Sequence, residues 1–514
     1  MSRTKSSIKN FVFAMIGQAL GLIISFIARI FFIQKLGTEY LGLNGLFTNL
    51  LSVLSLAELG VGNAITFSLY KPLAEQDIKK CKMLMTLYKK VYTVIGCIIL
   101  IIGISIVPFL NFFISEIPVI SHVKIIYILF VINTSISYFY SYKRNLIIAD
   151  QNRYIATIYR YAFYFFYNLA QIIYLIFFNN YIVFLLIQIL STILENYFIS
   201  KKADKMYPYL KDKDIIKLDK TSKDEIVKNT KAMMMHKIGG VVVSSTDNIL
   251  LSKFVGLVAV GLYSNYYMII SALNTVFGQI FNSLTASIGN LCALDSTDKQ
   301  YDVFRKINFI TFWIYAFSSI SLLCLFNQFI EIWVGKEYLF NINVVLILVV
   351  NFYITGVRKS VITFRDATGL FYADRWKSVI EAIINLVVSI LLAYKFGTFG
   401  VFLGTFISSI CTCVWIEPFV LYKYGFNKKL TTYFIDYFKK LFLTTMIAIL
   451  TYMLCSVYNG NIYISFIINC LICCIVPNLI LFIIYRKSDE FNYFYDKVFS
   501  KIVNKFFKKK VINE

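Results

Sequence analysis

The sequence predicts an all-α integral membrane protein with about 14 transmembrane helices. Of its 514 residues, 58% are hydrophobic and only 15% are charged, whereas an ordinary soluble domain is about 45–50% apolar and about 25% charged. The apolar residues come in runs of about 20, the length at which a helix crosses a bilayer, and the basic residues gather in alternate connecting segments. These observations exclude a sizeable soluble catalytic domain and a secreted protein. An outer-membrane barrel is excluded because alternating segments of about 10 residues are absent.

The apolar runs give the order of the predicted spans. We expect them at 11–33, 40–69, 91–113, 125–148, 155–178, 182–200, 232–253, 258–292, 307–330, 342–366, 378–394, 400–422, 441–457 and 463–485. The stretches 40–69 and 258–292 exceed the length of one crossing, so we expect them to tilt, kink or project past the bilayer. The first run is too long for the apolar region of a signal peptide and lacks a small-residue cleavage site, which predicts a retained first span.

The distribution of basic residues tests this order independently. With the N-terminus placed in the cytoplasm, 45 of the 51 Lys and Arg fall in cytoplasmic segments and the adjoining helix ends. Because cytoplasmic loops are enriched in Lys and Arg, this predicts an even number of spans and two cytoplasmic termini. The net charge of +23 is then explained by basic loops at a membrane, and we expect no nucleic acid partner. Membrane lipids are the expected surroundings.

Several kinds of site lack a sequence signature. No Gly-rich loop of the P-loop type occurs, so ATP bound to this chain is not expected to drive transport. The ten cysteines show neither metal-finger nor disulfide-framework spacing, and Cys470, Cys473 and Cys474 are expected to pack between helices. We therefore expect no metal and no cofactor. The longest predicted outside loops have about eleven residues, which leaves no room for an outer catalytic domain.

Two parts of the sequence resemble each other at an offset of 219 residues. Residues 21–43 and 240–262 align without gaps and share six identities, including the glycine pairs Gly37/Gly256 and Gly42/Gly261. Each part ends one predicted span, forms a short outside loop and begins the next span. Spans 1–6 and 7–12 are therefore predicted to be two copies with the same orientation. Repeats that enclose a site near the membrane midplane are typical of alternating-access transporters.

The repeat and the loops predict the domain organisation. It comprises an N-terminal six-helix lobe (1–200), a basic cytoplasmic linker (201–231), a C-terminal six-helix lobe (232–425), an extra helix pair (426–485) and a basic cytoplasmic tail (486–514). In the tail, apolar residues such as Phe491 and Tyr495 recur at helical spacing, which predicts an amphipathic helix on an anionic inner leaflet. A frayed basic tail is the alternative.

Charged residues inside the predicted spans are the candidate functional residues, because a charge at the bilayer centre costs at least about 2.5–3.5 kcal/mol. Arginine suits a phosphate head, since its planar fork donates two parallel hydrogen bonds. The candidate pyrophosphate ligands in a net-basic cavity are Arg29, Arg358, Arg365, Lys143 and Arg144. The candidate carboxylates for the cavity or for coupling to H⁺ or Na⁺ are Glu58, Asp247 and Asp366.

Structural explanations compete with these roles. Arg29 and Glu58 can form an ion pair, and Asp247 can also be paired. Lys143, Arg144 and Arg358 can simply flank the cytoplasmic face, as the positive-inside rule describes. Arg365 and Asp366 can lie at the cytoplasmic interface.

Five segments resemble a known family. They are ELGVGNAI at 58–65, LIIADQNRY at 146–154, TDNILLSKFVGLVAVGLYSNY at 246–266, RDATGLFYADRWK at 365–377 and GVFLGTFIS at 400–408. They are similar to the polysaccharide-unit flippases, the O-antigen and capsule repeat-unit exporters of the multidrug/oligosaccharidyl-lipid/polysaccharide exporter superfamily. The resemblance covers about residues 8–425, and the stretch 246–266 is its most specific part.

The resemblance implies two six-helix lobes around a central, positively charged cavity in a bacterial cytoplasmic membrane. It also implies a transporter rather than an enzyme. The transporter would move undecaprenyl-pyrophosphate-linked oligosaccharide repeat units to the outer leaflet for surface polysaccharide biosynthesis. An ion gradient, as in an antiporter, or the membrane potential would drive it, and a polymerase and glycosyltransferases of the same pathway are expected partners. The extra helix pair departs from the twelve-span pattern and is similar to that of lipid II flippases, in which added helices border a lipid groove.

Two other functions stay open at this point. A cation-coupled multidrug exporter of the same superfamily would favour an acidic cavity, whereas the predicted tenth span is basic. An integral-membrane polysaccharide polymerase would need a large outer loop with catalytic Arg or His. Here the predicted outside loops hold only Lys35, Lys124, Lys253, Lys336, Lys395 and His122 as basic residues.

Overall fold

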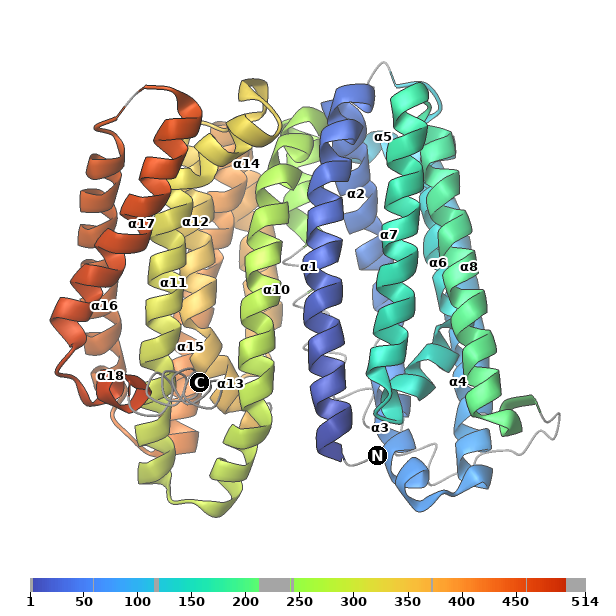
Figure 1. Ribbon diagram of the computed structural model, residues 1–514, viewed down its shortest axis with the longest axis horizontal. Coiled ribbons are helices and arrows are strands. Elements are labelled where there is room, and N and C mark those ends of the chain that lie inside the picture. Colours follow the sequence, from blue (N-terminus) through green and yellow to red (C-terminus); the bar gives the residue numbers. More distant parts are fainter. Residues whose placement is uncertain are drawn as a thin grey trace, which may run out of the picture. The chain divides into compact units, whose positions relative to one another are not determined.

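The computed structural model describes residues 3–58, 60–114, 120–211, 241, 245–370, 373–458 and 460–495. Every regular element in these ranges is a helix (Figure 1), which confirms the predicted all-α membrane fold. Nine stretches within them are long and apolar enough to cross a membrane. Large apolar side chains stand exposed on their surfaces, as expected of helices that face lipid; Ile101, Phe109 and Leu391 are 65%, 66% and 68% exposed.

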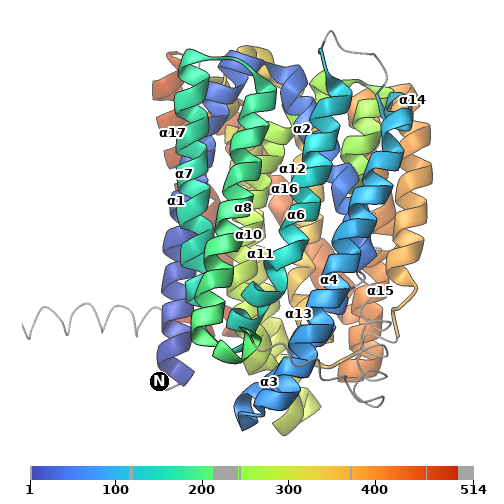
Figure 2. The same cartoon turned by 90° about the vertical axis from the view of Figure 1, so that its right-hand side faces the viewer.

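The chain divides into two compact units, Met1–Ser264 and Asn265–Glu514. The long helices of the first unit are α1 (Arg3–Leu36), α2 (Thr38–Leu54), α3 (Val61–Glu75), α4 (Ile78–Ile106), α6 (Val123–Ala149), α7 (Arg153–Phe177) and α8 (Tyr181–Met206). Helix α1 packs along α7, α7 along α8, α8 along α6, and α6 along α4 (Figure 2). Short elements connect them: η1 (Ser55–Glu58), η2 (Val107–Phe109), α5 (Leu110–Phe113) and η3 (Pro208–Lys211).

Helix α10 (Leu257–Leu294) begins in the first unit and continues into the second. The second unit also contains α11 (Thr297–Trp333), η4 (Lys336–Tyr338), α12 (Ile342–Val357), α13 (Lys359–Ala367), α14 (Lys377–Cys411), α15 (Cys413–Val420), η5 (Leu421–Phe426), α16 (Leu430–Cys455), α17 (Ile462–Tyr485) and α18 (Asp489–Phe494). Helix α11 contacts α12, α16 and α17, and α16 packs along α17 (Figure 1). The predicted extra helix pair thus corresponds to α16 and α17, both anchored on α11.

Glycine breaks two of the long apolar runs. Of the tilt, kink or projection expected for 40–69, the structure shows a kink at Gly60, which precedes α3. Its φ of 80° is a conformation that glycine adopts without a Cβ clash. The apolar stretch Lys377–Phe426 has 50 residues, about 75 Å of helix, against a hydrocarbon core of about 30 Å. Gly397, with φ 56° and ψ −133°, interrupts it between the two spans predicted at 378–394 and 400–422.

Helix ends differ from the predicted spans where charged turns extend a helix. The segment 70–90 is expected to be a cytoplasmic loop, yet α4 already begins at Ile78, with Asp77 accepting a hydrogen bond from the Lys80 backbone at 2.9 Å. Hydropathy marks where a helix meets lipid, not where its hydrogen bonds begin. Similarly, α8 runs to Met206 inside the predicted linker. The remainder of that linker beyond Lys211, and the tail beyond Tyr495, lie outside the described residues.

The two copies of the sequence repeat meet at reciprocal positions. A Cβ on Gly42 would lie 2.0 Å from the Leu257 carbonyl oxygen, and a Cβ on Gly261 would lie 2.5 Å from the Thr38 carbonyl oxygen. The offset of 219 relates Gly42 to Gly261 and also Thr38 to Leu257. The starts of α2 and α10 therefore touch backbone to backbone through equivalent residues. The other aligned pair, Gly37 and Gly256, has a positive φ in both copies, 86° and 120°.

This contact predicts a position-specific effect of added bulk. Gly42→Ala should lower the free energy of unfolding by about 1–3 kcal/mol, because the new methyl group forces the Leu257 backbone away. Gly278→Ala is the matched control, since nothing lies within 4 Å of a Cβ at that position of α10. Thermal unfolding of both variants in detergent tests this. An equal melting temperature for the two would contradict the close contact.

Candidate functional site

The most buried charged cluster of the described chain lies in the second unit. Arg358, between α12 and α13, is 7% exposed, and Glu417 on α15 is 0% exposed. The Arg358 guanidinium donates from Nε to Glu417 Oε2 at 2.9 Å and from Nη2 to Oε1 at 2.7 Å. Lys377, the first residue of α14, donates to Glu417 Oε1 at 2.5 Å and lies 3.8 Å from Glu381. Arg358 is therefore a buried, forked ion pair and does not merely flank the membrane face.

Arg365 is held in a second cluster near the end of α13. Its Nη2 donates to Asp366 Oδ1 at 2.8 Å, and its Nη1 donates to Asp374. Arg365 is 8% exposed and Asp374 is 3% exposed, so this ion pair is buried within the second unit. The location of Arg365 and Asp366 at the cytoplasmic interface stays a prediction. Asp366, predicted as a cavity carboxylate, therefore pairs with Arg365, which is itself predicted as a cavity cation.

The two candidate cations of α6 are also paired, within the first unit. Lys143 donates to Asp204 at 2.7 Å. Arg144 donates to Glu195 at 2.7 Å and to the Asn196 side chain at 2.9 Å. Both cations lie on α6 and their three partners lie on α8, so these bonds link the two helices. Four of the five predicted cavity cations therefore have an observed carboxylate partner: Arg358, Arg365, Lys143 and Arg144.

Arg29 has a different observed partner. Its Nη1 donates to the Ser264 hydroxyl at 2.8 Å, and that hydroxyl donates to the Gly261 carbonyl at 2.8 Å. One turn before Arg29, the Ser25 hydroxyl is hydrogen-bonded to Tyr164 of α7. Arg29 therefore joins α1 to the start of α10 next to the reciprocal glycine contact.

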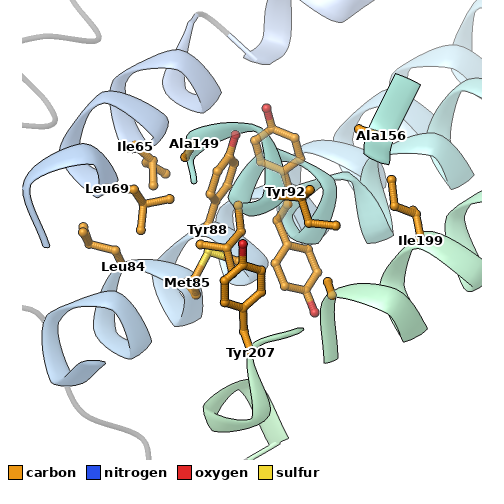
Figure 3. Packing of buried hydrophobic residues seen from close by; sticks show 14 of the residues in the cluster. Ile65, Leu69, Leu84, Met85, Tyr88, Tyr92, Ala149, Ala156, Ile199 and Tyr207 are labelled. Carbon is orange, nitrogen blue, oxygen red and sulfur yellow. The ribbon is translucent and has the colours of Figure 1, made fainter. Parts of the chain in front are cut away.

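Glu58 belongs to a polar network at the break between α2 and α3. Its Oε1 accepts a hydrogen bond from the Tyr92 hydroxyl at 2.6 Å. The Tyr92 ring packs against that of Tyr88, with centroids 4.6 Å apart. The Tyr88 hydroxyl donates to the Gly62 carbonyl at 3.0 Å. The same hydroxyl accepts a hydrogen bond from the Asn145 side-chain amide at 2.5 Å. Tyr88 and Tyr92 lie on α4 and belong to a buried apolar cluster (Figure 3). The Glu58 carboxylate is therefore bound by a tyrosine hydroxyl at the edge of this cluster.

Asp247 lies in the helical segment 245–254 and is partly buried. Of the oxygen donors expected beside it, Ser245 and Thr246 are 2% and 8% exposed, and the Asn248 Oδ1 is buried without a hydrogen-bond partner among the described residues. Ser244 lies outside the described residues. The role of Asp247 in ion coupling stays a prediction.

An apolar groove of about 680 Å³ runs along the second unit, within the volume range typical of ligand pockets. Helices α11, α12, α14, α15 and α16 line it with side chains such as Leu346, Val350, Phe406, Ala448 and Ile449. Tyr353 and Tyr437 border both this groove and a small void beside it. Asn308 and Lys440 border both that void and a polar pocket of about 460 Å³. The apolar groove, the small void and the polar pocket therefore lie next to one another and share lining residues.

The polar pocket carries charges of both signs. Arg305 pairs with Glu490, and Lys440 pairs with Asp436 at 2.6 Å. Lys439 lines the same pocket and makes no side-chain hydrogen bond or ion pair within the described ranges. Lys359, beside Arg358, is partly buried and likewise has no such partner there.

Sequence reasoning missed several members of these clusters. Glu417, Glu381, Lys377 and Asp374 are not among the candidate residues of the sequence analysis. One signal was available: Glu417 stands alone among apolar residues in CVWIEPFV, and an isolated buried acid requires a cation nearby. Which cation it takes depends on the fold, because Arg358 lies 59 residues away.

No family model matches the sequence, and no curated protein matches it at a significant level. Solved structures do match. The lipid II flippase MurJ in an inward closed conformation has a TM-score of 0.65 and 14% identity, covering 93% of this chain and 99% of its own. An inward-facing MATE multidrug resistance transporter of the MOP superfamily has a TM-score of 0.59 and 15% identity, covering 80% and 98%. A mutant of the MATE transporter VcmN of Vibrio cholerae has a TM-score of 0.57 and 13% identity, covering 84% and 99%.

The chain has the fold of the MOP-superfamily transporters. This is the fold that the sequence resemblance implied. At 13–15% identity the likeness is one of fold, and the polysaccharide-unit flippase, its substrate and its central cavity stay predictions. The predicted roles of Arg29, Arg358, Arg365, Lys143, Arg144, Glu58, Asp247 and Asp366 likewise stay predictions.

The Arg358 cluster predicts a large stability effect of a small change. Glu417→Gln leaves Arg358 and Lys377 buried without their carboxylate, so it should lower the free energy of unfolding by about 3–5 kcal/mol. The control is Glu75→Gln, which removes an exposed pair with Lys71 at 3.8 Å and should cost less than about 1 kcal/mol. Melting temperatures in detergent compare the two. Similar small shifts would mean that the cluster does not stabilise the second unit.

Proposed function

We propose that this protein is an alternating-access flippase for undecaprenyl-pyrophosphate-linked oligosaccharides, a transporter and not an enzyme. The observation that carries the proposal is the closeness of an apolar groove to a polar, cation-bearing pocket in the second unit, since both border the same small void. A lipid-linked oligosaccharide has the same division into a long apolar chain and an anionic, sugar-bearing head. The groove would hold part of the polyisoprenoid chain while the head is handled by polar groups.

The comparisons support this substrate class over a multidrug exporter. The lipid II flippase aligns with 93% of this chain, and the two multidrug transporters align with 80% and 84%. The chain also carries the helix pair α16–α17, and α16 supplies one wall of the groove. The name of this flippase gives lipid II as its substrate. We propose that the groove beside the helix pair α16–α17 binds the apolar chain of a lipid-linked substrate of similar chemistry.

A multidrug exporter of the same fold is the second candidate. The wide apolar groove favours it, because such a lining also suits lipophilic drugs. A cationic drug would need an acidic counter-charge, however, and the carboxylates Glu417, Asp374, Glu195 and Asp204 all have cationic partners. This pairing favours the lipid-linked anion.

The headgroup ligands follow from charge and pairing. Arg29 is the proposed ligand from the first unit, because a guanidinium fork suits pyrophosphate oxygens. In the second unit the proposed ligands are Lys439, which lines the polar pocket, and Lys359, because a phosphate can approach either one without displacing a carboxylate. Arg358, Arg365, Lys143 and Arg144 would contribute only by exchanging a carboxylate for the substrate. Coupling to H⁺ or Na⁺ through Glu58 or Asp247 is part of the proposal, and imposed proton, Na⁺ or voltage gradients would identify the ion.

The first prediction concerns the groove. Ala448→Trp should fill it and reduce flipping of undecaprenyl-pyrophosphate-linked oligosaccharide in proteoliposomes at least about 10-fold, because a buried indole takes the space of the lipid chain. Leu450→Trp, on the same helix at a side chain 45% exposed and outside the groove, is the matched control and should flip normally. Equal rates would remove the groove from the substrate path.

The second prediction concerns the head. Arg29→Ala and Lys359→Ala should each abolish flipping of the pyrophosphate-linked substrate while the protein remains in the membrane. Arg29→Lys should restore only part of the rate, because an ammonium is a point charge and not a fork. Lys395→Ala, at an exposed lysine, is the control. If activity is lost only because the variant protein disappears from the membrane, Arg29 has a structural role and does not bind substrate.

A further inference from the structure

Three cysteines from three helices converge within the second unit. Cys324 lies on α11, Cys455 is the last residue of α16, and Cys473 lies on α17. Their three sulfur atoms all lie within 4.8 Å of one another, and the Cys455 and Cys473 sulfurs are 4.0 Å apart. The side chains are 9%, 6% and 1% exposed. No other group of this kind occurs in the described residues, although all ten cysteines are among them.

The spacing fits a metal centre better than a covalent bond. A disulfide has an S–S length of about 2.05 Å, about half the observed separation. A metal–thiolate bond of about 2.3 Å places the sulfurs of a flat three-coordinate site about 4.0 Å from one another. The Cys455–Cys473 separation of 4.0 Å matches this value, and the two separations to Cys324 are at most 4.8 Å. Shifts of a few tenths of an ångström in the side chains are then enough to bring all three sulfurs to bonding distance of one ion.

The donor set selects the class of ion. The group consists of soft sulfur atoms alone, and no His, Asp or Glu of the described chain joins it. Hard cations such as Mg²⁺ and Ca²⁺ take oxygen ligands, and structural Zn²⁺ takes four ligands. Soft thiolates select Cu(I). We propose that Cys324, Cys455 and Cys473 form a three-coordinate site for a monovalent thiophilic ion, with Cu(I) as its representative.

Charge balance sets how many protons leave on binding. Partly buried apolar neighbours, Leu325 and Ile472, pack against the three cysteines. Three thiolates on one Cu(I) would leave a net charge of −2 in this apolar surrounding, whereas two thiolates and one neutral thiol leave −1. Burial penalises the higher charge, so binding releases two protons from two of the thiols while the third keeps its proton.

The consequence is mechanical. Helices α16 and α17 have no counterpart in the predicted six-helix repeat, and the site joins both of them to α11. An ion bound there would fix the pair against the helix bundle and stabilise the protein, because it binds the folded chain and not the unfolded one. This inference does not depend on the proposed transport function.

The test uses the full-length protein in detergent under anaerobic, reducing conditions with Cu(I) as the probe. Competition with a chromophoric Cu(I) chelator should reveal one tightly held ion per chain, with two protons released per ion. X-ray absorption should show sulfur ligands at about 2.3 Å. Cu(I) should also raise the melting temperature of the wild-type protein.

Matched variants decide the location. Cys324→Ser, Cys455→Ser and Cys473→Ser should each weaken Cu(I) binding at least about 100-fold, while Cys474→Ser and Cys411→Ser, at exposed cysteines, should not. Cys473→Ala is a second substitution that keeps the site apolar. Size-exclusion profiles of the serine and alanine variants are compared with that of the wild-type protein, so that a folding defect is distinguished from a loss of Cu(I) binding. Unchanged binding in the triple serine variant would overturn the proposal, and so would a Cys455–Cys473 disulfide in the protein purified without reductant.

Discussion

A charge in the apolar part of a membrane must be neutralised, and the second unit is organised around that requirement. An isolated charge there costs at least about 2.5–3.5 kcal/mol, and Arg358 meets the cost by forking onto Glu417. Because Lys377 shares the same carboxylate, one acid on α15 fixes the α12–α13 junction and the start of α14. Packing alone would leave these ends free to slide, whereas directed charge-assisted bonds fix their register.

The same requirement changes what an intramembrane cation means for function. A pyrophosphate that binds Arg358 must displace Glu417, and the displaced acid then stays buried and repels it. Lys359, next in sequence, involves no such exchange. The paired cations therefore serve first as structure. Under the proposed function, they would reach the substrate only in a conformation that separates each pair.

Hydropathy and glycine predicted more of the fold than of the site. The kink at Gly60 and the reciprocal contact of Gly42 with Gly261 were within reach of the sequence, because span length and the repeat are local or periodic signals. The start of α4 at Ile78 could not be predicted, since charged helical turns outside lipid resemble loops in hydropathy. The Arg358–Glu417 pair was also out of reach, because only the fold brings together residues 59 positions apart.

The helix pair α16–α17 shapes the apolar groove, because α16 supplies one of its walls. Polar bonds seat the pair on α11: the Trp313 indole donates to Asn478 at 2.8 Å, and the Asn469 amide donates to Gln328 at 3.0 Å. With α17 held this way, α16 closes the side of the groove that α11, α12 and α14 leave open. Without the pair, the apolar lining would face lipid directly and hold nothing. The shape of the groove therefore depends on a few polar hydrogen bonds between α11 and α17.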